Sequence, residues 1–283
     1  MILMLVIFLV ILALIWLIFA VVSDLKTREI PNWLNFSLII FALGARLFYS
    51  VFNDLDFSFF IQGVFGFAVF FLIANLLYFG RFFAGGDAKL MMALGPILSF
   101  GAGFLPNLNL FLVFLFVFLL VGAIYCLIIV FGLSIKKFHK IKREFLKQVK
   151  LNKKIIIIFL VLGIILMISG YLYASLFVLG IWISLTPYLM IYAKTIDESC
   201  MVEKIQTSQL TEGDWLYKDV KVGKDTIKQK WEGLSRKEIR LIRKNNKFVM
   251  IKRGIQFSPV FLISFLIYAY LFLMKIDLWN SLW

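Results

Sequence analysis

The chain alternates long apolar runs with short polar segments. Residues 2–22 form an apolar run of the length that a helix needs to cross a bilayer, which is roughly 20 residues. Further runs of this kind are expected as helices at 33–52, 59–80, 88–104, 109–133, 155–169, 171–192 and 256–274. These runs are continuously apolar rather than alternating, so they predict helices and not a membrane barrel. The expected fold class is an all-α, polytopic membrane helical bundle.

The expected helix count rests on two divisions inside long apolar stretches. We place these divisions at residues 106–109, where the sequence is PNLN, and at residues 169–170, where it is SG. They give eight predicted helices, of which the fourth and sixth are short. Either short helix and its neighbour could instead be one tilted helix plus a re-entrant piece, which leaves a range of six to eight.

Basic residues gather in the segments that the alternating spans place on one side. Nearly all of the 30 Lys and Arg residues lie in the polar segments 23–32, 80–89, 134–154 and 194–254. The positive-inside rule therefore predicts that this side is cytoplasmic and that both termini are external, in the cell membrane. Arg46 is the exception inside a predicted span, and we expect it to snorkel toward the outer interface.

The formal net charge of +14 comes mainly from two of these segments. Residues 134–154 carry nine Lys or Arg against Glu144 alone, and residues 194–254 carry fifteen against nine acids. Basic residues that flank membrane spans bind anionic lipid, and little aromatic interleaving is present for base stacking. Membrane lipid is therefore the expected partner, and nucleic acid is not.

Metal and cofactor chemistry finds little support. His139 is the single histidine and sits in a lysine run, Cys126 lies in a predicted span, and Cys200 lies in a basic segment. No CxxC pair exists to hold zinc, and Ser-His or Cys-His nucleophilic schemes lack a base. We expect no metal and no cofactor.

Carboxylates remain as candidate catalytic groups. Residues 1–143 contain only five acids, and two of them, Asp54 and Asp56, fall in an outer loop. Asp24 ends the first span and Asp87 begins the fourth on the same predicted side, so the two can meet if the helices are neighbours. Two acids in a poorly hydrated site share one proton near neutral pH, as in aspartic proteases. The ionised member then activates water while the protonated member polarises the scissile carbonyl.

Simpler interpretations exist for each acid. Asp87 follows two glycines and precedes an apolar helix, as a helix N-cap does. Asp24 follows Ser23 and is an ordinary interfacial charge at the end of a span. Asp87 could also belong to an ion or proton pathway, since acids inside membranes often do.

Two motifs resemble a known family. The segment SDLKTREIPNWL (23–34) is similar to the first signature of type IV prepilin peptidases and archaeal preflagellin peptidases, and AGGDAKLMMALG (84–95) is similar to their second, G-x-G-D followed by lysine. The segment GIQFSPVFLISFL (254–266) resembles the entry to the last helix of the family. Polar stretches before it resemble the cytoplasmic region of archaeal members.

The resemblance implies a function and a partner. It implies a membrane aspartic endopeptidase that cleaves the basic leader peptide of type IV pilin-like or archaellin-like precursors, with Asp24 and Asp87 as catalytic pair. Gly85 and Gly86 would let a helix or an extended substrate approach closely. Lys89 would tune Asp87 or bind a substrate carbonyl, or would snorkel to the surface.

This sequence departs from the family pattern at three places. Ala84 stands where the family has the first glycine of G-x-G-D, and Gln256 stands where the last-helix motif has proline. The early cytoplasmic segment with cysteines, found in many bacterial members that also methylate the new N-terminus, is missing. We therefore expect peptidase activity without methyltransferase activity.

The expected organisation has three parts. Residues 1–193 form the transmembrane peptidase domain, residues 194–254 a basic cytoplasmic module, and residues 255–283 the final helix with a short external tail. In the module, Ser235 and Glu238 have the spacing of a capping box, and residues 215–222 alternate like a strand. Two other functions stay open, namely an ion-coupled carrier that uses Asp87 and Arg46, and a non-catalytic scaffold of pilus assembly.

Overall fold

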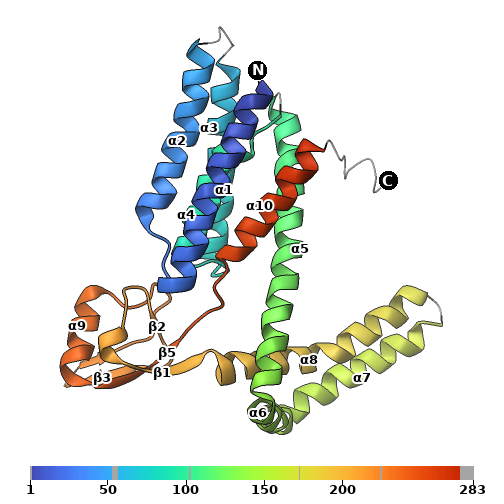
Figure 1. The fold of residues 1–283 in the computed structure, drawn as a ribbon. Coiled ribbons are helices and arrows are strands. Elements are labelled where there is room, and N and C mark those ends of the chain that lie inside the picture. The colour runs from blue at the N-terminus through green and yellow to red at the C-terminus, as the bar shows by residue number, and fades with distance from the viewer. Residues whose placement is uncertain (1, 53–56, 102, 172, 224, 275–283) are drawn as a thin grey trace. The chain divides into compact units, whose positions relative to one another are not determined.

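The computed structural model describes residues 2–52, 57–101, 103–171, 173–223 and 225–274. These residues form ten α-helices, one 3-10 helix and five short strands (Figure 1). The predicted all-α membrane bundle is confirmed, and the strands are confined to a small basic module. The chain divides into two compact units, one made of Met1–Cys126 with Ile255–Trp283 and the other of Leu127–Gly254. The predicted three-part organisation stays a prediction.

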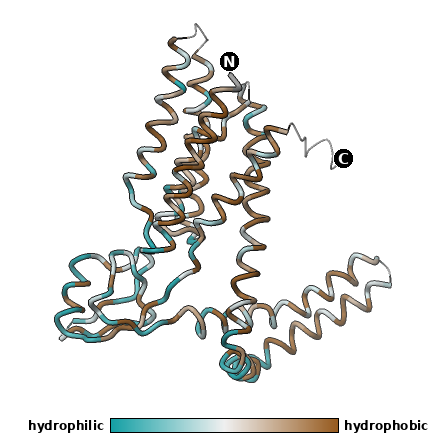
Figure 2. Tube along the Cα trace, viewed as in Figure 1, coloured by the Kyte–Doolittle hydropathy of each residue, from teal (hydrophilic) through white to brown (hydrophobic). Residues whose placement is uncertain are grey.

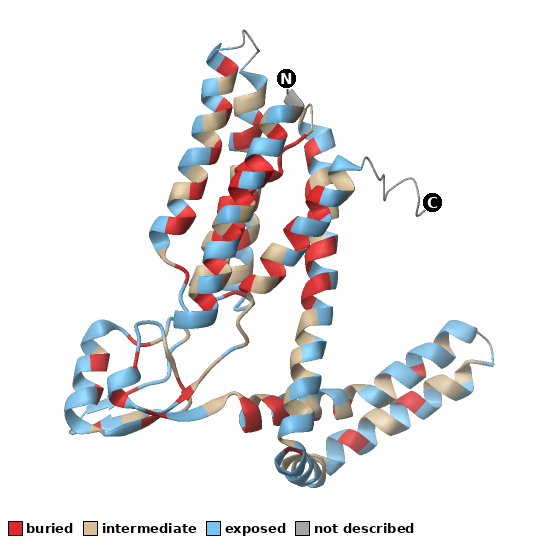
Figure 3. Cartoon of the chain, viewed as in Figure 1, coloured by how far each residue is buried: buried red, intermediate tan, exposed pale blue. Residues whose placement is uncertain are grey.

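The first unit is a bundle built around a short central helix. Its helices are α1 (Ile2–Thr27), α2 (Asn32–Phe52), α3 (Ser58–Phe79), α4 (Gly85–Leu98), the first part of α5 (Phe104–Lys136) and α10 (Ser258–Leu273). Helix α4 lies against α1, α2 and α3, and α10 lies against α1. Figure 3 shows buried positions along the facing sides of these helices. The central place of α4 explains why nine of its residues are buried.

Packing in this unit uses glycine between α3 and α4 and phenylalanine rings between α3 and α5. Gly66 of α3 and Gly95 of α4 face each other so closely that a Cβ on either would collide with the backbone of the other. Helix α5 instead contacts the bundle through aromatic rings, such as Phe111 against Phe70 of α3, with ring centroids 5.2 Å apart. Small residues and interlocking rings are two ways of packing helices where no water drives association.

Five described helices, α1, α2, α3, α5 and α8, are long and apolar enough to cross a membrane, and a bent helix pair gives up to six (Figure 2). Helix α4 has 14 residues, hence about 21 Å of length against a hydrocarbon core of about 30 Å. The predicted span over 88–104 is therefore wrong as a full crossing. The predicted helix over 256–274 is present as α10, with 16 residues.

The predicted division at 106–109 is also wrong, because α4 ends at Leu98 and α5 already begins at Phe104, so that residues 106–109 are helical. Pro106 lies in the first turn of α5, where a missing backbone N–H costs nothing. Asn107 stabilises the break, since its amide donates to the carbonyls of Gly101 and Gly103 at 3.1 and 2.8 Å and accepts from Gly101 N–H at 2.7 Å.

The second unit contains the rest of α5 with a helical part and a mixed module. Its helical part consists of α6 (Phe138–Leu151), α7 (Lys153–Ser169) and α8 (Ala174–Cys200). The predicted division at 169–170 is confirmed by the end of α7. Gly163 and Gly180 bring α7 and α8 into backbone contact. Helix α6 lies in the predicted polar segment 134–154, is bent by 76° from α7, and packs against α8.

The module follows α8. Its elements are β1 (Val202–Gln206), η1 (Thr207–Gln209), β2 (Trp215–Leu216), β3 (Val220–Val222), β4 (Asp225–Ile227), α9 (Arg236–Asn245) and β5 (Phe248–Lys252). Strands β1 and β2 pair antiparallel on either side of β5, and β3 pairs with β4. The predicted capping box is confirmed, because Ser235 and Glu238 bond reciprocally at the start of α9. The Ser235 backbone N–H, together with the Lys230 ammonium, lowers the pKa of Glu238.

Candidate active site

The first motif places a buried carboxylate at the end of α1. Asp24 is 7% exposed although it lies only three residues before the helix ends at Thr27. Arg28 ends the helix in the left-handed conformation, with φ of 60°, and its N–H donates to the Asp24 carbonyl at 2.8 Å. The chain then turns back through Ile30, which is buried, into α2. This reversal keeps the motif packed against the bundle.

The second motif places Asp87 in the first turn of α4. The N-cap of α4 is Ala84, so Asp87 is the third helical residue and not the N-cap that one simpler interpretation predicted. Its half-buried carboxylate accepts the backbone N–H of Ala84. An acid at this position satisfies a free helix N–H and is stabilised by the helix dipole.

The fold brings the two motif carboxylates together. Asp24 and Asp87 are 63 residues apart in sequence, yet they lie close enough to repel each other electrostatically. Helices α1 and α4 are in direct contact, which is the condition under which the two acids can meet. The geometry therefore agrees with a carboxylate pair at one end of α4.

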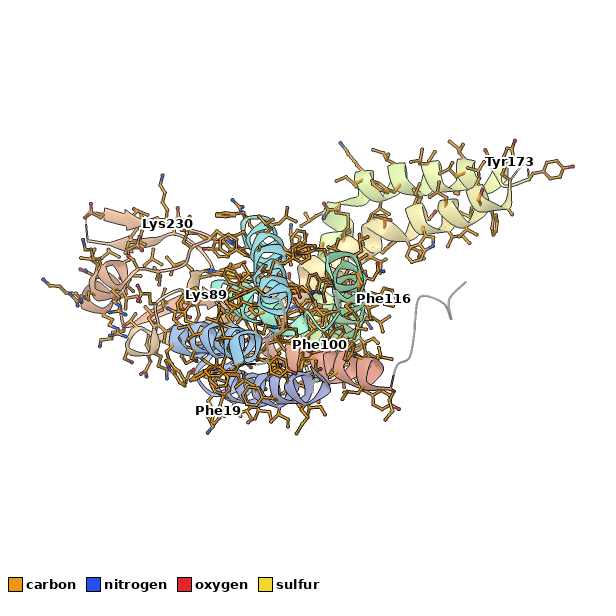
Figure 4. The ribbon with its side chains drawn as sticks, turned by 90° about the horizontal axis from the view of Figure 1, so that it is seen from above. Phe19, Lys89, Phe100, Phe116, Tyr173 and Lys230 are labelled. Carbon is orange, nitrogen blue, oxygen red and sulfur yellow. The ribbon has the colours of Figure 1, made fainter. Side chains whose placement is uncertain are left out.

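Contacts between the two motifs extend beyond the acids. Lys89, labelled in Figure 4, donates from Nζ to Oδ1 of Asn32 at 2.7 Å and so ties α4 to the start of α2. Gly86 lies against Ile30, because a Cβ at Gly86 would sit 3.6 Å from the Ile30 Cβ. Lys89 thus has a structural partner in the first motif, in addition to any role toward a substrate.

The glycines of the second motif are not required by backbone strain. A Cβ on Gly85 would meet only Tyr78, at 3.9 Å, and a Cβ on Gly86 would make ordinary contacts with Ile30. Ala84 itself adopts φ of −71° and ψ of 161°, an extended conformation open to any residue. The alanine at this position therefore fits the fold without strain.

A third segment, which the sequence did not single out for chemistry, completes the site. Ser258, the first residue of α10, donates from Oγ to Oδ2 of Asp24 at 2.6 Å. Gln256 donates from Nε2 to the Asp24 carbonyl, and its own carbonyl accepts the Tyr125 hydroxyl at 3.0 Å. The residue that weakened the match to the last-helix motif is therefore itself a contact of Asp24. The resemblance of residues 254–266 to the last-helix motif of the family was the sequence signal that could have identified this segment.

Arg46 lies away from this site, and the expectation that it snorkels to an interface is wrong. Its side chain is fully buried, and its guanidinium donates to the carbonyls of Phe59 at 3.1 Å and Ser99 at 2.7 Å. Ser99 directly follows the far end of α4. Twelve residues of rise separate it from Asp87, about 18 Å, so the two charges do not form a pair.

The described residues offer no cluster of three or more His, Cys, Asp or Glu side chains that could hold a metal ion. The site instead offers two neighbouring carboxylates, one fixed by a serine hydroxyl and the other by a helix terminus. Such a pair can exchange protons with water and with a carbonyl oxygen. These features define a class of protein, a helical membrane bundle with a buried two-carboxylate site.

Comparison with known proteins finds a similarity for part of the chain. Residues 11–130 match the type IV leader peptidase family. The match includes Asp24, Asp87 and helices α2 and α3 between them, and it confirms the resemblance over this segment. Comparisons with curated proteins and with solved structures find no match. The chain is thus a membrane protein with a segment similar to leader-processing proteases.

Proposed function

We propose that this protein is a membrane-embedded aspartic endopeptidase that removes the basic leader peptide of type IV pilin-like or archaellin-like precursors. One observation carries the proposal: the carboxylates of two separate motifs, Asp24 and Asp87, meet at one end of α4 inside a leader peptidase-like segment. Cleavage would take place at the cytoplasmic face of the cell membrane, with the basic segments cytoplasmic and both termini external. Methylation of the new N-terminus is not part of the proposal.

The mechanism needs one ionised and one protonated carboxylate. The ionised member takes a proton from water as the water oxygen bonds to the scissile carbonyl carbon, and the protonated member gives its proton to the carbonyl oxygen. The resulting gem-diol then loses its C–N bond. The leaving nitrogen receives the proton taken from water, and one hydroxyl of the gem-diol returns a proton to the other acid. Both carboxylates regain their starting states, and one water has been added across the peptide bond.

The neighbouring residues would hold the site and admit the substrate. Gly85 and Gly86 present backbone without side chains at the start of α4, where an extended peptide could approach. Lys89 would act from its bond to Asn32, either on Asp87 or on a substrate carbonyl. The match to the leader peptidase family makes a precursor protein the expected substrate.

Neither other candidate function gains support from the site. A carrier that uses Asp87 with Arg46 would need the two charges on one pathway, whereas they lie at opposite ends of α4. A scaffold with a degenerate motif would be suggested by a strained alanine, whereas Ala84 has an ordinary backbone conformation.

The test is a cleavage assay in detergent with a precursor that bears a basic leader. Wild type is compared with Asp24→Asn and Asp87→Asn, and Glu198→Gln is the matched control because its carboxylate is partly exposed and 4.0 Å from Lys194. We expect cleavage by wild type and the control only, unaffected by a chelator. Cleavage that survives both aspartate substitutions would overturn the carboxylate pair. Lack of cleavage of any basic leader would favour a carrier or a scaffold.

A further inference from the structure

The start of α10 presents two donors to one oxygen of Asp24. Ser258 is fully buried, and its Oγ and its backbone N–H lie 2.6 and 3.4 Å from Oδ2 of Asp24. The N-cap of α10 is Phe257, so the Ser258 hydroxyl does not cap its own helix. The hydroxyl is therefore available to Asp24.

The two carboxylates differ in what stabilises a negative charge. Each lies at a helix N-terminus, Asp24 at that of α10 and Asp87 at that of its own α4, and that dipole stabilises a negative charge on each. Asp87 also accepts the backbone N–H of Ala84. Asp24 alone has a side-chain hydroxyl at a short distance, and hydrogen bonds to a charged acceptor are among the strong ones.

Burial and the dipole of α1 both oppose a negative charge on Asp24. Asp24 is 7% exposed and lies in the last turn of α1, and removal from water favours the neutral form of Asp87 as well. Burial therefore does not select one acid, whereas the C-terminal end of α1 disfavours ionisation of Asp24. The serine decides which acid is ionised because it supplies a donor that offsets these effects at Asp24.

Other titratable groups around Asp24 do not replace this contact. Asp87 of α4 repels Asp24, and the Tyr125 hydroxyl of α5 faces Asp24 but donates to the Gln256 carbonyl. Lys26 and Arg28 follow Asp24 within about one turn and are exposed. Exposed cations interact weakly because water screens them.

We propose that Ser258 is a positioning residue that keeps Asp24 as the ionised acid, so that Asp24 takes the proton from water and Asp87 donates to the substrate carbonyl. This inference rests on the proposed peptidase function. It predicts that loss of the hydroxyl moves the shared proton from Asp87 to Asp24.

The first test locates the proton without any cleavage. Dicyclohexylcarbodiimide adds to a protonated buried carboxyl and leaves an N-acylurea, which peptide mass spectrometry locates. At pH 7 in detergent, we expect label on Asp87 in wild type and in Ser264→Ala, and label on Asp24 in Ser258→Ala. Ser264 is the matched control, being equally buried on α10 with no hydrogen-bond partner for its Oγ among the described residues. Label on Asp24 in wild type, or an unchanged pattern in Ser258→Ala, overturns the proposal.

The second test is the pH profile of leader cleavage. Ser258→Ala should move the acid limb of kcat upward by about 1 pH unit, whereas Ser258→Thr, which keeps the hydroxyl, and Ser264→Ala should keep the wild-type profile. A Ser258→Ala variant that is slower by the same factor at every pH has lost only structure, and this result overturns the proposal. If wild type cleaves no basic leader, the proposed function fails while the labelling result still decides the role of Ser258.

Discussion

The two ends of α4 both bury polar groups in an apolar bundle, but they do so in opposite ways. At the Ser99 end, Arg46 donates to two backbone carbonyls and lies over the Phe59 ring, with Cζ 4.2 Å from the centroid. Nearby, the Tyr268 hydroxyl donates to the Leu98 carbonyl at 2.9 Å. At the Asp87 end, two acids repel each other. One end is an arrangement of donors with acceptors, and the other holds two acids that oppose each other's ionisation.

The difference distinguishes an end of α4 that stabilises the fold from an end that is suited to chemistry. A buried cation bonded to the Ser99 carbonyl, at the end of α4, satisfies a group that would otherwise lack a partner, and this stabilises the break between α4 and α5. Two neighbouring carboxylates do not stabilise a fold, because each opposes ionisation of the other. Such a pair is expected at a functional site, where proton exchange makes use of it.

The largest effect should follow loss of an acid. We expect Asp87→Asn to lower the rate of leader cleavage about 10²- to 10⁴-fold, the usual contribution of a general acid or base. The temperature of thermal unfolding in detergent should stay at the wild-type value or rise, because asparagine keeps the shape of the side chain and removes an acid whose ionisation Asp24 opposes. A loss of stability as large as the loss of activity would mean that the Asp87 end of α4 has a structural role, as the Ser99 end has.

The opposite result is expected for Arg46→Met. The substitution keeps an unbranched, apolar stem but removes the charge and leaves the Ser99 carbonyl without the donor of Arg46, at a cost on the order of 3 kcal/mol. The midpoint of thermal unfolding measures this loss. The unfolding midpoint of Arg46→Lys, which keeps the charge without the planar guanidinium, should lie between those of wild type and Arg46→Met. Full stability of Arg46→Met would contradict a structural role for this end.

Gly63→Ala tests the space around the Arg46 side chain, which reaches the Ser99 end of α4. A Cβ at Gly63 would lie 2.5 Å from Cδ of Arg46, so we expect a loss of about 1–2 kcal/mol in the wild-type background. In the Arg46→Met background, whose side chain can adopt other rotamers, the cost should be smaller. A double-mutant cycle from thermal unfolding measures the coupling. Additive effects would show that Gly63 is not needed to make room for the Arg46 side chain.

The role of Lys89 can be assigned by comparing a Lys89 variant with a variant of Asn32, its hydrogen-bond partner. Lys89→Met and Asn32→Ala both remove the bond between the motifs, and each should cost about 1 kcal/mol in unfolding free energy. If Lys89 acts only as a link, the two variants lower the cleavage rate equally. A much greater loss for Lys89→Met would assign the lysine to the substrate or to Asp87.

Ala84→Gly should have the smallest effect. Because Ala84 is exposed and extended, the family glycine adds freedom without removing strain, and we expect cleavage rate and stability to change less than about twofold. Cleavage assays at saturating substrate measure the change. A large gain of activity would indicate that the substrate backbone meets the Ala84 methyl group.

Several features of the fold follow from local sequence. Membrane helices are long apolar runs, so α1, α2, α3 and the division after α7 were predictable from hydropathy alone. The two acids could be chosen as candidates because charges are scarce in residues 1–143 and the motifs resemble a family. The predicted break at 106–109 failed because Pro106 is equally compatible with a loop and with a first helical turn.

The sequence by itself determined the membrane bundle, the two acidic motifs and the candidate pair Asp24 and Asp87. Only the tertiary structure decided the partners of these groups. Ser258 lies 234 residues from Asp24, and the Ser99 carbonyl lies 53 residues from Arg46. Hydropathy is a local property of the chain, whereas the burial and hydrogen bonding of a charge depend on which distant helices pack around it. Arg46 stays inside the bundle for this reason, because carbonyls of distant segments accept its hydrogen bonds, whereas the sequence pattern predicted that it would snorkel to the interface.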